Sequence, residues 1–343
     1  MRYRTLGRTG IKVSPYALGA LMFGASIGNP DHDDSIRIIH KALDAGINLV
    51  DTADRYSQGK SEEVVGKALK GRRNDVVLAT KFSGPMGDDA NQQGGSRRWI
   101  MTAVENSLRR LQTDHIDLYQ IHRPDPDTDV DETLSALSDL IHSGKVRAIG
   151  SSTMPASDIV EAQWVAERRG LERFHTEQPP YSILNRGIEA EVLPVAQRYG
   201  MGILAWGPLG QGMLTGRARK GHDSDLVRAA LGMKAITDER RLDAVEQLIP
   251  LAAEAGLPMT HLAMAFATTH PGVTSALLGP HTMDQLDDLL AGLEVSLSDE
   301  ILDRIDEIVP PGTDIGTLDQ AHLPPALLHP TLRRRPAEAR AAG

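Results

Sequence analysis

One pattern recurs along the chain: an amphipathic segment is followed by a glycine and then by a short run of apolar residues. The glycines are Gly46, Gly144, Gly170 and Gly200. A glycine directly after a helix adopts the left-handed conformation that ends the helix, and the apolar run that follows is typical of a buried strand. Each occurrence therefore predicts a helix joined to the next strand.

Eight apolar runs are predicted to be strands, and most of them start about 30 residues apart, which is one helix and one strand per unit. Strands buried on both faces that alternate with helices indicate a parallel sheet. Eight units favour a closed (β/α)8 barrel over an open sheet, which would prefer an early Gly-x-Gly-x-x-Gly turn that the sequence lacks. The predicted strands are residues 16–20, 47–51, 76–81, 116–122, 146–151, 174–178, 202–206 and 273–278.

Several segments depart from the repeating unit. Residues 1–14 predict a β-hairpin that closes the floor of the barrel. Residues 83–95, rich in Gly, Asp and Asn, predict a loop long enough to cover a site. Between the seventh and eighth strands we expect a loop at 210–225 and two helices at 238–255 and 259–270.

The end of the chain has a different composition from the rest. We expect one barrel domain over residues 1–310, including extra helices after the last strand. Residues 311–343 are rich in proline and then basic, and they predict an irregular peripheral tail.

The composition of the chain argues against several classes of protein and of partner. The chain has 343 residues and a formal net charge of −9, which argues against a nucleic acid or an anionic membrane as partner. No stretch approaches the roughly 20 apolar residues that cross a bilayer, and residues 1–5 lack the apolar core of a secretion signal. The absence of cysteine excludes disulfides and thiolate sites and fits the cytoplasm, where we expect the protein.

The carboxyl ends of the predicted strands carry the candidate chemistry, because active sites of such barrels lie at that end. Asp51 ends the second strand, and a charge there is costly unless it is paired. Lys81, which ends the third strand, is the cation that Asp51 requires. Tyr56 lies just beyond the second strand and His122 ends the fourth, so we expect the four side chains to converge.

This combination is suited to protonating an oxygen. An ammonium group beside a phenol favours the phenolate and lowers the pKa of the phenol toward neutrality. Asp51 would keep Lys81 charged, and His122 would bond to a substrate carbonyl oxygen or share the proton with Tyr56. No nucleophile, metal-binding cluster or pair of catalytic carboxylates accompanies the four residues.

Other interpretations compete with this one. Taken singly, a tyrosine beside a strand is usually a packing residue, and a Lys–Asp pair at a barrel rim is often only structural. Four compatible residues on neighbouring strands make coincidence the weaker explanation. A barrel glycosidase would need two facing carboxylates, but Asp51 is committed to Lys81, which leaves only the loop acids Asp54, Asp125 and Asp127.

From residue 3 to about residue 309 the chain resembles the aldo-keto reductase superfamily, and within it the bacterial branch that also resembles potassium-channel beta subunits. The motifs that carry the resemblance are residues 46–53 (GINLVDTA) with Tyr56, 62–66 (EEVVG), 79–81 (ATK), 107–111 (SLRRL), 114–122 (DHIDLYQIH) and 207–216 (GPLGQGMLTG).

The resemblance implies a monomer or small homo-oligomer that reduces a small aldehyde or ketone to the alcohol with a hydride from NADPH. It assigns the role of general acid to Tyr56, a tuning role to Lys81 and Asp51, and the orientation of the carbonyl group to His122. The alternative is a cofactor-binding regulatory subunit that senses redox state, has slow reductase activity and resembles the channel subunits.

The resemblance also implies a cofactor site that follows strands five to eight. It places the nicotinamide at Ser152, Gln178 and Trp206, the pyrophosphate at Leu209, Gly210, Gly212 and Arg217, and the adenosine end at Gly279, His281 and Gln285. His281 stands where relatives often carry an arginine against the 2′-phosphate, so NADH is the alternative cofactor. Thr153 stands where the family often has Asn, which would change one carboxamide contact.

We expect the substrate at the mouth of the barrel, lined by Phe23, Met86 and Arg123. Trp99 is a further aromatic residue near the long loop. Its place early in a helix with Ser96 as N-cap favours burial of its ring in packing over contact with substrate.

Overall fold

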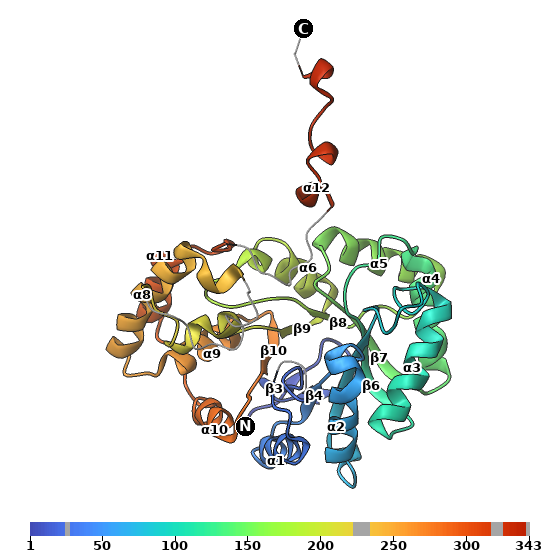
Figure 1. Cartoon of the computed structure of the whole chain (residues 1–343), viewed down its shortest axis with the longest axis horizontal. Helices are drawn as coiled ribbons and strands as arrows, with labels where there is room; N and C mark the ends of the chain where they lie inside the picture. The colour runs from blue at the N-terminus through green and yellow to red at the C-terminus, as the bar shows by residue number, and fades with distance from the viewer. Residues whose placement is uncertain (25–27, 222–233, 317–324, 341–343) are drawn as a thin grey trace.

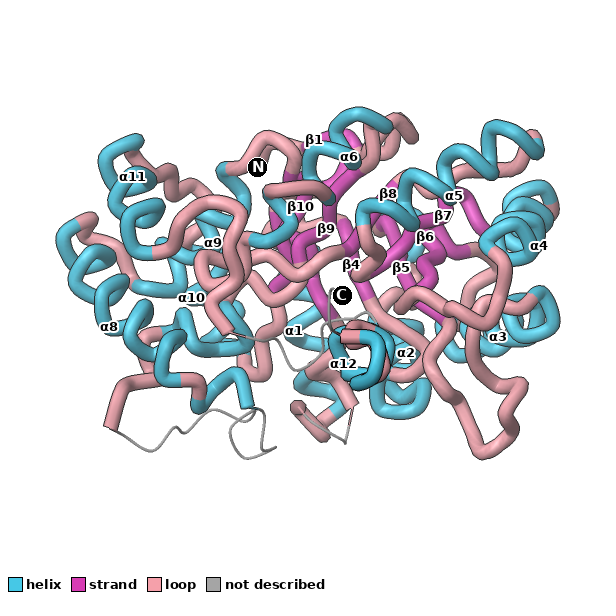
Figure 2. The backbone as a smooth tube through the Cα atoms, turned by 90° about the horizontal axis from the view of Figure 1, so that it is seen from above, coloured by secondary structure: helices cyan, strands magenta, loops and turns pink. Residues whose placement is uncertain are grey.

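The computed structural model confirms the closed barrel. It describes residues 1–343 except 25–27, 222–233, 317–324 and 341–343. Eight parallel strands close in the order β10-β3-β4-β5-β6-β7-β8-β9 (Figures 1 and 2). They are β3 (Tyr16–Gly19), β4 (Leu49–Asp51), β5 (Val77–Phe82), β6 (Ile116–Ile121), β7 (Val146–Ser152), β8 (Thr176–Gln178), β9 (Gly202–Ala205) and β10 (Val273–Leu278).

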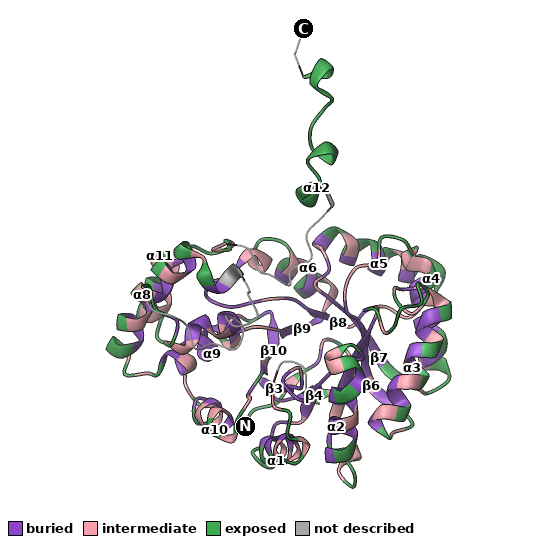
Figure 3. Ribbon diagram, in the orientation of Figure 1, coloured by how far each residue is buried: buried purple, intermediate pink, exposed green. Residues whose placement is uncertain are grey.

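Helices surround the strands and turn their buried faces toward them (Figure 3). They are α1 (His32–Asp44), α2 (Lys60–Ala68), α3 (Arg97–Leu111), α4 (Val130–His142), α5 (Ala156–Arg169), α6 (Val192–Tyr199), α8 (Glu239–Glu254), α9 (Met259–Thr269), α10 (Met283–Ala291) and α11 (Asp299–Ile308). No described helix combines the length and the apolar character that crossing a bilayer requires.

Local signals explain where these helices begin and end. Ser96 caps α3 by accepting a hydrogen bond from the backbone N–H of Trp99, as predicted. Gly170 and Gly200 end α5 and α6 in the left-handed conformation. Gly46 and Gly144 also have positive φ, one position further past their helix ends. The predicted joints between helix and strand are therefore confirmed.

Inward-facing side chains of the barrel form two layers, because every second residue of a strand points to the same face. The lower layer is apolar and includes Leu49, Ala79 and Leu118. Two residues further along the same strands come Asp51, Lys81 and Gln120, which form the polar layer above it. This step from apolar to polar marks the carboxyl end of the barrel as the chemical end.

The predicted hairpin, β1 (Arg4–Thr5) and β2 (Lys12–Val13), is antiparallel and lies below the apolar layer. Leu6 and Val13 are completely buried in that layer. Asn48 donates to the carbonyl oxygen of Lys12 and accepts from the N–H of Ser14, at 2.8 Å each. Because Asn48 bonds to the hairpin, β4 begins at Leu49 and is shorter than the predicted strand.

The segment between β9 and β10 holds α8 and α9, close to the two predicted helices. Positions 222–225 of the predicted loop lie outside the described residues. Beyond α11, the short helix α12 (Pro325–Leu328) stands away from the barrel (Figure 1). That the barrel domain ends at 310 remains a prediction.

Candidate active site

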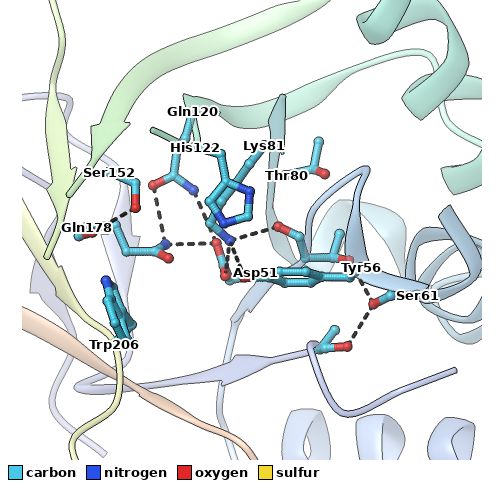
Figure 4. A network of polar contacts seen from close by, with 12 residues as sticks. Asp51, Tyr56, Ser61, Thr80, Lys81, Gln120, His122, Ser152, Gln178 and Trp206 are labelled. Atoms are coloured by element: carbon cyan, nitrogen blue, oxygen red, sulfur yellow. Dashed lines mark hydrogen bonds and ion pairs between the residues drawn. The ribbon is translucent and has the colours of Figure 1, made fainter. Parts of the chain in front are cut away.

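The four side chains predicted to converge lie together at the carboxyl end of the barrel (Figure 4). Lys81 Nζ is 2.5 Å from Asp51 Oδ2 and 3.3 Å from the hydroxyl of Tyr56. The rings of Tyr56 and His122 meet edge to face, with centroids 5.6 Å apart. Tyr56 begins the short 3-10 helix η1 (Tyr56–Gly59), which follows β4. The strand ends thus bring a phenol, an ammonium group and an imidazole into one place.

The buried carboxylate of Asp51 is fully supplied with partners. Lys81 provides the opposite charge, and the side-chain amides of Gln120 and Gln178 donate to Asp51 Oδ1 at 3.1 and 2.9 Å. Gln120 was missed by the sequence reasoning, although its place two residues before His122 puts both on the inner face of the barrel. Gln178, predicted to hold a carboxamide, uses its amide nitrogen for Asp51.

The charges of the site are set by burial and by neighbouring groups. Burial acts to lower the pKa of Lys81, but the charge of Asp51, with Tyr56 and their hydrogen bonds, raises that pKa overall. Burial, together with the charges of Lys81, Arg123 and Arg55, holds the pKa of His122 well below its ordinary value. The imidazole is therefore neutral at pH 7, and its buried Nδ1 has no partner among the described residues.

A second polar cluster lies behind the first, on the outer side of β5. Thr80 is adjacent to Lys81 but donates outward to Glu62 Oε1 at 2.6 Å. Arg110 Nε donates to Glu62 Oε2 at 2.6 Å. Beside them Asp54 accepts from the N–H of Arg55 at 2.6 Å, while its Oδ2 is unpartnered within the described chain. We call Thr80, Glu62, Arg110 and Asp54 the outer cluster.

The surroundings of Asp54 favour its protonated form. Burial and the charge of Glu62 raise the pKa of Asp54 to about 8. The side chain lines a cavity of about 100 Å³ together with Met86, Trp99 and Arg110. Met86 was predicted to line the substrate mouth, but the structure places it at this outer cavity.

Of the predicted nicotinamide residues, Ser152 and Gln178 end β7 and β8 and Trp206 follows β9. All three lie on the side of the barrel opposite Tyr56 (Figure 4). The hydroxyl of Ser152 donates to the backbone carbonyl of Gln178 at 2.9 Å. The indole N–H of Trp206 donates to the hydroxyl of Thr153 at 3.3 Å, which orients the ring. Thr153 has a positive φ of 55°.

The predicted pyrophosphate loop begins at Leu209 and continues as the 3-10 helix η4 (Gly210–Thr215). The resemblance places the pyrophosphate at Gly210 and Gly212, whose N–H groups donate to the carbonyl oxygens of Gly207 and Leu209 in this structure. Contact of these residues with a pyrophosphate stays a prediction. The side chain of Gln211, by contrast, is buried with both amide atoms unpartnered among the described residues.

The remaining predicted residues lie in the segments that follow β6, β9 and β10. The side-chain oxygen of Gln285 accepts from the N–H of His281 at 2.8 Å, close behind Gly279. Arg123 follows His122, and its guanidinium carbon is 6.0 Å from the centre of the Trp206 ring. Arg217 is exposed beyond η4.

Phe23 does not reach the mouth. Its side chain has 0% exposure and packs in the core around the barrel. The chain after β3 turns back, with a bridge between Phe23 and Asn29, so the ring points into packing rather than toward substrate.

Comparison with known proteins gives consistent matches. The sequence model of the Aldo/keto reductase family matches residues 16–310. The chain is 40% identical over 321 residues to the uncharacterized oxidoreductase YrpG of Bacillus subtilis, covering 90% of this chain and 96% of that protein. It is 38% identical to the aldo-keto reductase YhdN of the same organism, covering 84% and 88%. It is 35% identical to a probable voltage-gated potassium channel subunit beta of Oryza sativa subsp. japonica, covering 90% and 97%.

Proposed function

Because the chain belongs to the aldo/keto reductase family, we propose that it reduces an aldehyde or ketone to the alcohol with NADPH, with Tyr56 as general acid. The family and the relatives named as oxidoreductases make the protein an oxidoreductase. One observation carries the finer proposal. The Lys81 ammonium group bonds at the same time to the carboxylate of Asp51 and to the hydroxyl of Tyr56.

The residues fit a nicotinamide cofactor. Trp206 offers a half-buried ring held by Thr153, and Gln211 holds two unpartnered amide atoms next to the predicted pyrophosphate loop. We assign the nicotinamide to Ser152, Gln178 and Trp206, the pyrophosphate to Leu209, Gly210, Gly212 and Arg217, and the adenosine end to Gly279, His281 and Gln285. For Gly210 and Gly212 the contact is close approach of the backbone, since their N–H groups are engaged.

NADPH, when bound, supplies the hydride. The side chains of the protein supply and transfer the proton. Tyr56 donates its hydroxyl to the carbonyl oxygen and gives up the proton as that oxygen gains charge. Lys81 stabilises the phenolate that remains, and Asp51 fixes the ammonium group in position. His122, neutral and with Nδ1 unpartnered in the described structure, orients the carbonyl group by a hydrogen bond.

The proposal extends to the setting of the enzyme. We place it in the cytoplasm, which the absence of cysteine supports. We propose a monomer or small homo-oligomer. NADPH is the proposed cofactor and NADH the alternative. A redox-sensing regulatory subunit is not favoured, because the relatives named as an oxidoreductase and an aldo-keto reductase are 40% and 38% identical, against 35% for the relative named as a channel subunit.

A panel of aldehydes and ketones, each tested with NADPH and with NADH, examines the proposal. We expect rapid oxidation of NADPH with an activated substrate such as 4-nitrobenzaldehyde, followed by absorbance of the reduced nicotinamide. Absence of oxidation with every carbonyl compound would refute the proposed reaction. Very slow turnover, together with a partner that co-purifies, would instead support the regulatory alternative.

A further inference from the structure

We propose that Gln120 is a positioning residue for the cofactor: it holds the side-chain amide of Gln178 so that only the oxygen of that amide is left to face the nicotinamide. The inference rests on the proposed function and deepens it, since it concerns the proposed nicotinamide site. Its basis is a set of hydrogen bonds that joins this site to the Lys81–Asp51 ion pair (Figure 4).

The side-chain nitrogen of Gln178 is held by two acceptors. It donates to Asp51 Oδ1 at 2.9 Å and, in a longer bond, to the side-chain oxygen of Gln120 at 3.4 Å. An amide nitrogen carries two hydrogen atoms, so these bonds use both of them. The side-chain oxygen of Gln178 accepts no hydrogen bond from the described residues. It is therefore the atom of the amide that remains for a ligand.

The Asp51 carboxylate determines which end of each amide faces it. A carboxylate paired with an ammonium group, as Asp51 is with Lys81, accepts hydrogen bonds and does not donate them. Both amides therefore turn their nitrogen toward Asp51 Oδ1, and Gln120 donates to it at 3.1 Å. This leaves the oxygen of Gln120 for Gln178. Reversal of either amide would place acceptor against acceptor in this triangle.

A glycine in the intervening strand gives Gln120 room to reach Gln178. Gln120 lies on β6 and Gln178 on β8, and β7 separates the two strands. Gly150 of β7 is paired with Gln120, and an added Cβ there would stand 3.3 Å from Gln120 Cγ. Because Gln120 is completely buried, its amide is costly to keep there unless it is bonded. Its partners are Asp51 and Gln178.

The same bonds connect the cofactor site to the proposed acid. Asp51 binds Gln178 through Oδ1 and Lys81 through Oδ2, and Lys81 is 3.3 Å from the hydroxyl of Tyr56. The hydroxyl of Ser152 bonds to the backbone carbonyl of Gln178, so that both the backbone and the side chain of Gln178 are fixed. An oxygen held in this way accepts a hydrogen bond from the N–H of a carboxamide.

The test compares the binding of NADP⁺ with that of its 3-acetylpyridine analogue, in which a methyl group replaces the NH2 of the carboxamide. The wild-type protein should bind NADP⁺ about three- to tenfold more tightly, the size of one hydrogen bond. Gln178→Met should bring the ratio of the two Kd values close to one. Gln120→Met should lower the ratio about twofold or more, while the KM for 4-nitrobenzaldehyde is unchanged. Isothermal titration calorimetry measures the Kd values.

Thr176→Val is the matched control. Thr176 lies two residues before Gln178 on β8 and therefore on the same face of the strand. Its buried hydroxyl has no partner within the described structure. Removal of this hydroxyl should leave the ratio of the Kd values at the wild-type level.

A ratio close to one in the wild-type protein would overturn the inference, even if Gln120→Met did not fold, and would leave the reductase intact. So would an unchanged ratio in Gln120→Met, or an equal loss of the ratio in Thr176→Val. If NAD⁺ is the cofactor, NAD⁺ and its acetylpyridine analogue serve in the same way. Failure to bind any of these dinucleotides would refute the proposed function itself.

Discussion

Two neighbouring residues of β5, Thr80 and Lys81, belong to two different polar clusters. Lys81 points into the barrel and pairs with Asp51, while Thr80 points outward and donates to Glu62 in the outer cluster. Both clusters contain a deeply buried aspartate. Asp51 has an ammonium group and two amide donors, whereas Asp54 has one backbone N–H.

The two aspartates are equally buried but differ in their hydrogen-bond partners. Asp51 is 1% exposed and Asp54 is 0% exposed, yet Asp54 has its pKa raised to about 8 by burial and by Glu62. A buried carboxyl group with few donors and a neighbouring negative charge favours its protonated form. The inner cluster is organised around the Lys81–Asp51 ion pair. In the outer cluster Glu62 joins α2 to Thr80 of β5 and to Arg110 of α3.

The largest effect is expected from Lys81→Met in the inner cluster. We expect kcat to fall by about 10²–10⁴-fold, because Tyr56 loses the charge that assists proton donation. The free energy of unfolding should fall by about 3–5 kcal/mol, because Asp51 is left buried and unpaired. Steady-state kinetics and urea unfolding measure the two losses.

Adding Asp51→Asn to this variant is the control. Stability should return in part, since the unpaired charge is gone, while activity should stay lost. Restored activity in the double variant would contradict the assigned role of Lys81.

Asp54→Asn tests the outer cluster through pH. The folded pKa of Asp54, about 8, lies above its ordinary value, so the folded state holds the proton that the unfolded state releases. Wild-type stability due to this group therefore falls as the pH rises from about 4 to about 8. From pH 5 to pH 8 the variant should gain roughly 2–4 kcal/mol relative to wild type, at about 1.4 kcal/mol per pKa unit.

Urea unfolding at both pH values measures this gain. Glu177, whose pKa burial raises to about 7, is present in both proteins and cancels in the difference. A difference independent of pH would contradict the raised pKa of Asp54.

Glu62→Gln should have the smallest effect. The neutral amide removes the charge that pairs with Arg110, so we expect a loss of roughly 1–3 kcal/mol in unfolding free energy. Activity should be nearly unchanged, because the outer cluster does not touch the reacting groups. Glu63→Gln, on the same helix but paired with Lys60 at the surface, is the control and should cost little. A large loss of kcat in Glu62→Gln would couple the two clusters and contradict their separation.

The sequence was sufficient for the barrel and for the four converging residues. Periodic joints at glycines predicted the order of helices and strands, and the position of Asp51, Lys81 and His122 at strand ends placed them at one rim. The exact start of β4 could not be predicted, because Asn48 bonds to a hairpin distant in sequence.

Other features depend on which way a side chain faces in the closed barrel. Gln120 and the outer cluster were missed by the sequence analysis. The register of the strands decides whether a side chain points into the barrel, like that of Asp51, or to its outer side, like that of Asp54. Phe23 was predicted at the mouth from its place after a strand, but the turn after β3 directs it into the core. The roles of the individual site residues remain proposals that experiments must test.

The most direct measurement is a single-turnover experiment on Tyr56→Phe with NADPH already bound. Phenylalanine keeps the ring beside His122 and removes only the hydroxyl that bonds to Lys81. We predict that reduction of the bound aldehyde slows by about 10²–10⁴-fold, while the Kd for NADPH is unchanged. A wild-type rate in this variant would contradict the account, since the proton would then come from another group.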